Sequence, residues 1–154
     1  VSMNVLAIGG HYDDIELGAG GSIAKHVSEG DNVFAVVVTH SAYENYDGKL
    51  VRSKQTAWEE GVHAAKILGV DDLICLNYET KNVKYETKLI EDLNKIMDEK
   101  KIDVVYIGSM TYTKTIRQSE KPRSMLQGMY LEFLCIEATG TLLASNLLKT
   151  FLLI

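Results

Sequence analysis

The stretch "MNVLAIGGHYDD", from Met3 to Asp14, determines the fold that we expect. It begins as a short apolar run and ends in a histidine and two aspartates that follow a pair of glycines. A short apolar run bounded by glycine is typical of a buried strand in a parallel sheet. We therefore predict a first strand over Met3 to Gly9. His11, Asp13 and Asp14 then lie in the loop at its carboxyl end.

The next hundred residues alternate β-branched runs with segments of helical period. Further strands are predicted over 32–39, 72–76 and 103–106, and helices over 20–29, 51–68 and 87–100. This alternation predicts an α/β fold, a Rossmann-like, doubly wound and mostly parallel sheet with flanking helices. The glycines at 18, 20 and 21 are expected to turn the chain tightly into the first helix. Ligands of such sheets bind beyond the carboxyl ends of the strands, where the three loop residues and His40 fall.

Composition excludes several classes of partner. The 154 residues are 46% apolar and 24% charged, which is ordinary for one globular domain. The net charge is −5 and the basic residues are scattered among acids. No nucleic acid partner is therefore expected, since phosphate binding needs clustered lysine and arginine.

The two ends of the chain and the cysteines bear on location. The N-terminus lacks the pattern of a signal peptide. The apolar tail is interrupted by Asn146 and Lys149 and is shorter than the roughly 20 residues that span a bilayer, so no membrane partner is expected. Cys75 and Cys135 lie in apolar surroundings and form no CxxC pair, which indicates reduced thiols and a cytoplasmic protein.

The loop after the first strand has the composition of a metal site. An imidazole and a carboxylate, from His11 and Asp14, can turn toward one point and form a ligand pair suited to Zn²⁺. Asp13 between them can face the substrate as a general base. A loop of solvated acids that caps a helix is the simpler interpretation. A dinucleotide loop fits poorly, because the glycines do not match GxGxxG and the acids would face a pyrophosphate.

The pattern H-x-D-D-x-E-x-G-x-G-G, from His11 to Gly21, resembles the LmbE-like, or PIG-L-like, zinc-dependent N-deacetylases, which include the bacillithiol biosynthesis deacetylases. The resemblance continues through "GGSIAKHVSEGDNVFAVVVTH", "AAKILGV" and "LIEDLNKIMDEKKIDVVY", about two thirds of the chain. It implies a hydrolase that removes the acetyl group from a small N-acetylglucosamine-like conjugate. His11 and Asp14 would then be zinc ligands and Asp13 the base. Relatives are often oligomers, so a homo-oligomer stays open.

The same resemblance implies a third ligand, the last histidine of an H-x-D-H motif after the fourth strand. This chain has no histidine after His63, and beyond "DVVY" it stops resembling the family. Read from the third base of the Met110 codon, however, the genetic code permits "D-[ILV]-H-Q-D-H-Q-T-V" across Met110 to Ser119.

We therefore predict that the coding sequence changed frame between about Tyr106 and Met110. Residues 1–107 would then be the deacetylase-like α/β region, and 108–154 an out-of-frame segment. An out-of-frame segment has no reason to carry the hydrophobic patterning of a fold. A nucleotide sequence in which no frame encodes H-x-D-H would contradict this prediction.

Two further residues are candidates for substrate binding. His40, at the end of the second strand, would serve as a substrate contact or a makeshift ligand, although a hydrogen-bonded loop histidine is the commoner case. Arg52, at the start of the second predicted helix, has a planar fork that suits a sugar hydroxyl or a carboxylate. A solvated arginine at a helix end is equally open.

The remaining aromatic and histidine residues are weaker candidates. Tyr43, Tyr46 and Trp58 are candidates to line a sugar pocket, with ordinary packing as the simpler interpretation. His26 and His63 lie within helical segments away from the strand ends, so we assign them structural or surface roles. If the acids do no chemistry, the chain is instead a truncated, Rossmann-like binding module without catalysis.

Overall fold

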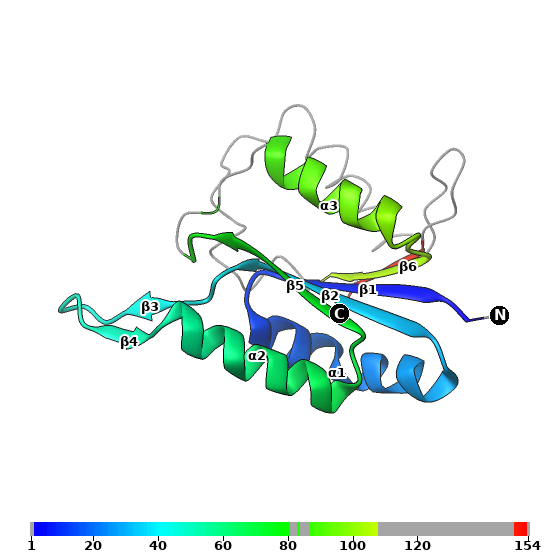
Figure 1. Ribbon diagram of the computed structural model, residues 1–154, viewed down its shortest axis with the longest axis horizontal. Helices are drawn as coiled ribbons and strands as arrows, with labels where there is room; N and C mark the ends of the chain where they lie inside the picture. The colour runs from blue at the N-terminus through cyan, green and yellow to red at the C-terminus, as the bar shows by residue number, and fades with distance from the viewer. Residues whose placement is uncertain (1, 81–82, 84–86, 108–149, 154) are drawn as a thin grey trace.

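The computed structural model has one five-stranded sheet with helices on both faces (Figure 1). It describes residues 2–80, 83, 87–107 and 150–153. The sheet consists of β1 (Asn4–Gly9), β2 (Asn32–Thr39), β5 (Asp72–Tyr78), β6 (Val104–Ile107) and β7 (Thr150–Leu153). The helices are α1 (Tyr12–Glu29), α2 (Lys54–Leu68) and α3 (Thr87–Glu99). A small hairpin of β3 (Tyr43–Glu44) and β4 (Leu50–Arg52) projects beyond one end of the sheet.

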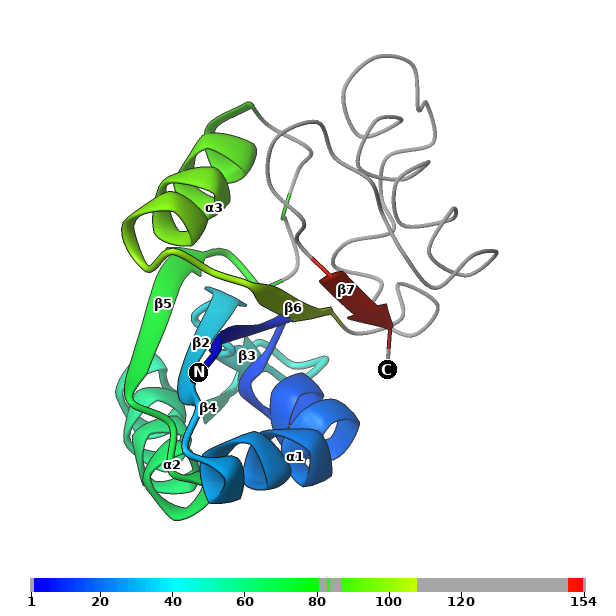
Figure 2. The same ribbon diagram turned by 90° about the vertical axis from the view of Figure 1, so that its right-hand side faces the viewer.

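The order of the strands is β5-β2-β1-β6-β7, and every neighbouring pair is parallel. The predicted α/β, Rossmann-like sheet is thereby confirmed. The chain builds outward from β1 to β5 and then returns to the other side of β1 to form β6. Helices α1 and α2 cover one face and α3 covers the other, as Figure 2 shows. The change of direction lies between β1 and β6, where sheets of this kind open a crevice at their carboxyl ends.

Both faces of β1 are buried, which explains its continuous apolar run. Val5 and Ala7 pack under α1 and α2, whereas Leu6 and Ile8 belong to the cluster beneath α3. Successive side chains of a strand point to opposite faces, so a strand covered on both sides is apolar at every position.

Helix α1 begins at Tyr12, and the predicted start at Gly20 is wrong. Four apolar residues at helical spacing bury one side of the helix against the sheet: Tyr12, Ile15, Ala19 and Ile23. The two aspartates of the first turn favour the positive end of the helix dipole. The glycines at 18, 20 and 21 therefore lie inside the helix and do not form a turn before it. Each costs about 1 kcal/mol relative to alanine, which the packing of the buried side offsets.

Helix α2 begins at Lys54, not at Val51. Its N-cap is Ser53, whose hydroxyl accepts the Thr56 N–H at 3.0 Å. The preceding residues pair with β3 in the hairpin, so Arg52 ends a strand and does not open a helix. The hairpin was not predicted, and β5 continues to Tyr78, beyond the predicted end at Leu76.

The segment 108–154 contributes one described element, β7, which pairs in parallel with β6. Residues 108–149, including Cys135, lie outside the described residues, so the change of frame stays a prediction. Within the ranges that the structure describes, no helix is both long and apolar enough to cross a bilayer.

The Tyr12 ring of α1 packs directly against Gly61 of α2. A Cβ at residue 61 would lie 2.6 Å from Cε1 of the Tyr12 ring, whereas a Cβ at Gly21 would meet nothing within 4 Å. Gly61→Ala is therefore expected to destabilise the fold by about 1–3 kcal/mol through overpacking. Gly21→Ala, the matched control, should stabilise it by up to about 1 kcal/mol through helix propensity. Thermal unfolding followed by circular dichroism checks both, and equal effects would contradict this packing.

His26 has the structural role that the sequence assigned to it. Its Nδ1 lies 2.7 Å from Asp31 Oδ2 and its Nε2 lies 2.9 Å from the Tyr106 hydroxyl. The other oxygen of Asp31 accepts the Met3 N–H at 2.8 Å. These contacts join the C-terminal end of α1 to the start of β1 and to β6, at the edge of the sheet opposite to His11. Since both imidazole nitrogens are occupied, the acids around His26 do not suggest a second metal site.

The contacts of Asp31 predict a dependence of stability on pH. The Met3 N–H and then His26 lower the pKa of Asp31 below its usual value. Its contribution is therefore complete above the unfolded pKa of about 3.9 and is lost as the pH falls through the lower native pKa. Asp31→Asn should lower the urea midpoint at pH 7, and the difference from wild type should shrink at about pH 3. A difference that does not change with pH would contradict this account.

Candidate metal and catalytic centre

The three residues that follow β1 come together at one point. His11 is the N-cap of α1, and Asp13 and Asp14 occupy the first turn of that helix. One ligand atom from each of the three lies within 4.8 Å of the others. Asp14 Oδ2 accepts the His11 N–H at 2.8 Å and lies 3.4 Å from His11 Nδ1. The capping geometry of a single helix start thus gathers an imidazole and two carboxylates at the carboxyl edge of the sheet.

The electrostatics of the cluster pair His11 with Asp14. The hydrogen bond with Asp14 raises the pKa of His11, against the opposite effect of burial. Burial tends to raise the pKa of Asp14, but the hydrogen bonds from His11 outweigh it and lower that pKa. Asp14 is therefore ionised at neutral pH, as a metal ligand must be. Asp13 is exposed and faces solvent beside this pair.

The donor set fits Zn²⁺, which binds imidazole nitrogen and carboxylate oxygen. Catalytic zinc normally takes three protein ligands, and His11 with Asp14 would supply two. The register of the sheet pairs Ile8 of β1 with Ile107 of β6. The end of β6 therefore lies beside the end of β1, which leads into the loop that carries His11. Ile107 is the last described residue before the segment in which the H-x-D-H motif is predicted.

His40 follows Thr39, which hydrogen-bonds to the Gly10 carbonyl next to His11. Its Nε2 lies 2.9 Å from Glu79 Oε2, and its Nδ1 accepts the Ala42 N–H at 3.1 Å. The ring is buried, with 4% of the residue exposed. Both nitrogens are engaged within the protein, which favours the hydrogen-bonded loop histidine over the makeshift ligand. A contact with substrate remains a prediction.

Arg52 faces the start of α1. The hydrogen bond with Asp14 raises the pKa of His11 and burial raises that of Glu16, and the positive charge of Arg52 opposes both rises, which places the guanidinium near the candidate centre. Nη2 lies 2.6 Å from Glu60 Oε2. Nε is buried and has no hydrogen-bond partner among the residues that the structure describes. Because buried donors are normally satisfied, a ligand group is a natural partner for this side of the fork.

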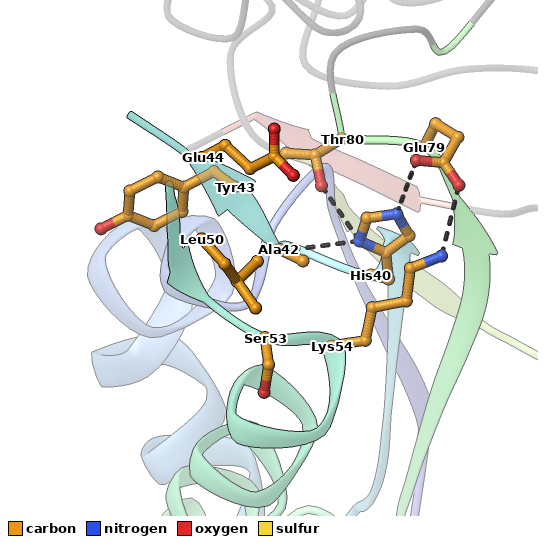
Figure 3. Close-up of a pocket in the computed structure, with 9 residues that line it drawn as sticks. All are labelled: His40, Ala42, Tyr43, Glu44, Leu50, Ser53, Lys54, Glu79 and Thr80. Carbon is orange, nitrogen blue, oxygen red and sulfur yellow. Dashed lines mark hydrogen bonds and ion pairs between the residues drawn. The ribbon is translucent and has the colours of Figure 1, made fainter. Parts of the chain in front are cut away.

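A pocket of about 450 Å³ is lined in part by His40 (Figure 3). His40 and Tyr43, both candidates from the sequence, line this pocket, and sequence reasoning missed the rest of the lining. Glu79 and Thr80 follow β5 beyond the predicted end of that strand, and Glu44 and Leu50 belong to the hairpin that was not predicted. The position of residues 77–80 after a strand was the one available signal, since every strand of a parallel sheet ends at the same edge. Tyr46 is fully exposed, and Trp58 lines a separate cavity of about 300 Å³.

Comparison with known proteins defines the class. The family model described as PIG-L, GlcNAc-PI de-N-acetylase, matches residues 6–115. The chain therefore belongs to the PIG-L family. The protein named uncharacterized deacetylase YaiS, from Escherichia coli K12, is 43% identical over 74 residues, which cover 48% of this chain and 37% of YaiS.

Solved structures agree with this class. The N,N'-diacetylchitobiose deacetylase from Pyrococcus horikoshii is 25% identical with a TM-score of 0.65, over 92% of this chain and 51% of that one. GalB, the 4-carboxy-2-hydroxymuconate hydratase from Pseudomonas putida KT2440, is 20% identical with a TM-score of 0.62, over 73% of this chain and 50% of that one. GalB shares the fold alone. The chain spans about half or less of the length of these relatives.

Proposed function

We propose that this protein is a zinc-dependent amide hydrolase that removes the acetyl group from a small N-acetylglucosamine-like conjugate. The observation that carries the proposal is the cluster of His11, Asp13 and Asp14, whose ligand atoms lie within 4.8 Å of one another at the end of β1. This cluster falls inside the segment that matches the PIG-L family model. The names of YaiS and of the chitobiose enzyme, both deacetylases, support the same chemistry.

Each residue has a role that follows from its position. His11 and Asp14 would hold the zinc ion, which when bound polarises an amide carbonyl and lowers the pKa of water toward about 7. Asp13, free of the His11–Asp14 pair, would take the proton from the attacking water and later pass it to the leaving amine. Arg52 would hold a hydroxyl or carboxylate of the substrate through its unsatisfied Nε.

We propose that zinc binding and acetate release are impaired in the chain as printed. It supplies two of the three ligands that catalytic zinc needs, and the third is proposed to be encoded in the shifted frame after β6. The test is zinc-dependent acetate release, measured for the printed chain and for the chain translated with the frame restored. Absence of release from the restored chain would leave the alternative, a binding module without catalysis.

A cytoplasmic location is proposed on the state of the cysteine that the structure describes. Cys75 is a free thiol, and its Sγ lies 3.5 Å from the Thr39 carbonyl oxygen. Persistent free thiols are typical of a reducing compartment. We also propose that the protein forms a homo-oligomer.

A further inference from the structure

The pocket of about 450 Å³ has walls from four elements: the β3–β4 hairpin, the start of α2, and the ends of β2 and β5 (Figure 3). It combines an apolar wall with several polar groups. Its lining includes His40, Tyr43, Glu44, Leu50, Lys54 and Glu79.

Two features relate the pocket to the candidate centre: a pair of hydrogen bonds between Thr39 and Gly10, and strand β4. The N–H and the hydroxyl of Thr39 donate to the Gly10 carbonyl oxygen at 3.1 and 2.8 Å. His11 and His40 each follow one member of this bonded pair. In β4, Arg52 faces the centre while Leu50 lines the pocket. The backbone that leads to His40 in the pocket thus lies beside the loop that carries His11.

His40 and Glu79 are joined by a hydrogen bond inside the pocket. His40 Nδ1 accepts the Ala42 N–H at 3.1 Å, and its Nε2 lies 2.9 Å from Glu79 Oε2. Glu79 also accepts a hydrogen bond from Lys54 Nζ at 3.2 Å. His40 and then Lys54 lower the pKa of Glu79, so its carboxylate is ionised at neutral pH.

The second carboxylate of the lining belongs to Glu44. Its side chain makes no hydrogen bond or ion pair with any residue in the described ranges. One lysine stands against two glutamates in the lining, so the pocket carries a net negative charge. Tyr43 and Leu50, 45% and 57% exposed, add an apolar wall against which the face of a ring can pack.

We propose that this pocket is a subsite for an uncharged, hydroxyl-bearing group joined to the acetylated sugar, and that Glu44 and Glu79 exclude phosphate and carboxylate groups. Carboxylates accept hydrogen bonds from hydroxyls, whereas an anion brought beside Glu44 meets a like charge, and the lysine of the lining, Lys54, is already paired with Glu79. The inference rests on the proposed function and narrows its substrate class to conjugates whose part inside the pocket is uncharged.

The test compares two probes on the full printed chain by calorimetry and by amide chemical shifts. N,N'-diacetylchitobiose is the uncharged probe, and N-acetylglucosamine 1-phosphate is the anionic one. The disaccharide is expected to shift the Ala42 and Thr80 amides, and the phosphate to bind at least about tenfold more weakly because of like-charge repulsion. Glu44→Gln should tighten binding of the phosphate by about threefold. Glu44→Lys should tighten it further.

Glu91→Gln is the matched control, since it removes the same charge from an exposed position on α3, across the sheet from the pocket. It should leave the affinity for both probes unchanged. The inference is overturned if the phosphate binds as tightly as the disaccharide, if Glu44→Gln behaves like Glu91→Gln, or if the disaccharide leaves the pocket amides unshifted. Failure of the proposed function is distinct: the restored chain would then bind the disaccharide in the pocket and release no acetate.

Discussion

Asp13→Asn is expected to lower acetate release by about 10²- to 10⁴-fold, the contribution typical of a positioned general base. Asparagine keeps the size of the side chain and its place in the first turn of α1 but cannot accept a proton. Asp13 also stands apart from the pair that His11 forms with Asp14. The affinity for zinc should therefore change little. Kinetics and zinc titration of the chain with the restored frame check both expectations.

Asp14→Asn is the matched variant, because it makes the same chemical change at the neighbouring position. Asp14 accepts the His11 N–H and contacts the His11 ring, so its loss should weaken zinc binding as well as turnover. If the two variants lost activity equally and both lost zinc, Asp13 would be a ligand and not the base. If Asp13→Asn kept most of its activity, the assigned base would be wrong.

The printed chain is expected to bind zinc weakly, and the chain with the restored frame at least about 100-fold more tightly. Loss of a partner in the outer shell of a metal site already costs about 10- to 100-fold in affinity, and a direct ligand should cost more. Because Ile8 of β1 pairs with Ile107 of β6, the restored segment would begin beside the strand end that leads to His11. Competition with a chelating dye measures both affinities. His11→Ala in the restored chain should return the affinity to that of the printed chain.

The layered fold was predictable because its strands are buried on both faces. The runs in β1, β2 and β6 are apolar at nearly every position. The helical segments between them indicate crossover connections, which join parallel strands. The start of α1 was missed because Gly18, Gly20 and Gly21 suggested a turn. The helix begins at Tyr12 because Tyr12 and Ile15 are buried against the sheet, and helix propensity alone does not predict this start. The hairpin was missed because strands of two or three exposed residues leave no periodicity.

The centre was more predictable than the pocket. His11, Asp13 and Asp14 are neighbours in sequence at a strand end, so one helix start gathers them. The pocket depends on Glu44 from the hairpin and Glu79 from the end of β5, which only the tertiary fold brings together. His40 was recognised by its position. The direction of its ring depends on Glu79 and Ala42 and could not be predicted.

The fold alone does not define the chemistry. A hydratase and a deacetylase both match this chain with TM-scores above 0.6. Function resides in the site that a fold carries, so the case for deacetylation depends on the three side chains after β1 and on the family to which they belong.

Acetate release from an N-acetylated sugar, measured side by side for the printed chain and the chain with the restored frame, tests this account most directly. The account predicts release by the restored chain in zinc, loss of that release on chelation, and little release by the printed chain under either condition. Tight stoichiometric zinc binding and full deacetylation by the printed chain would contradict it, as would a restored chain that binds zinc and releases no acetate.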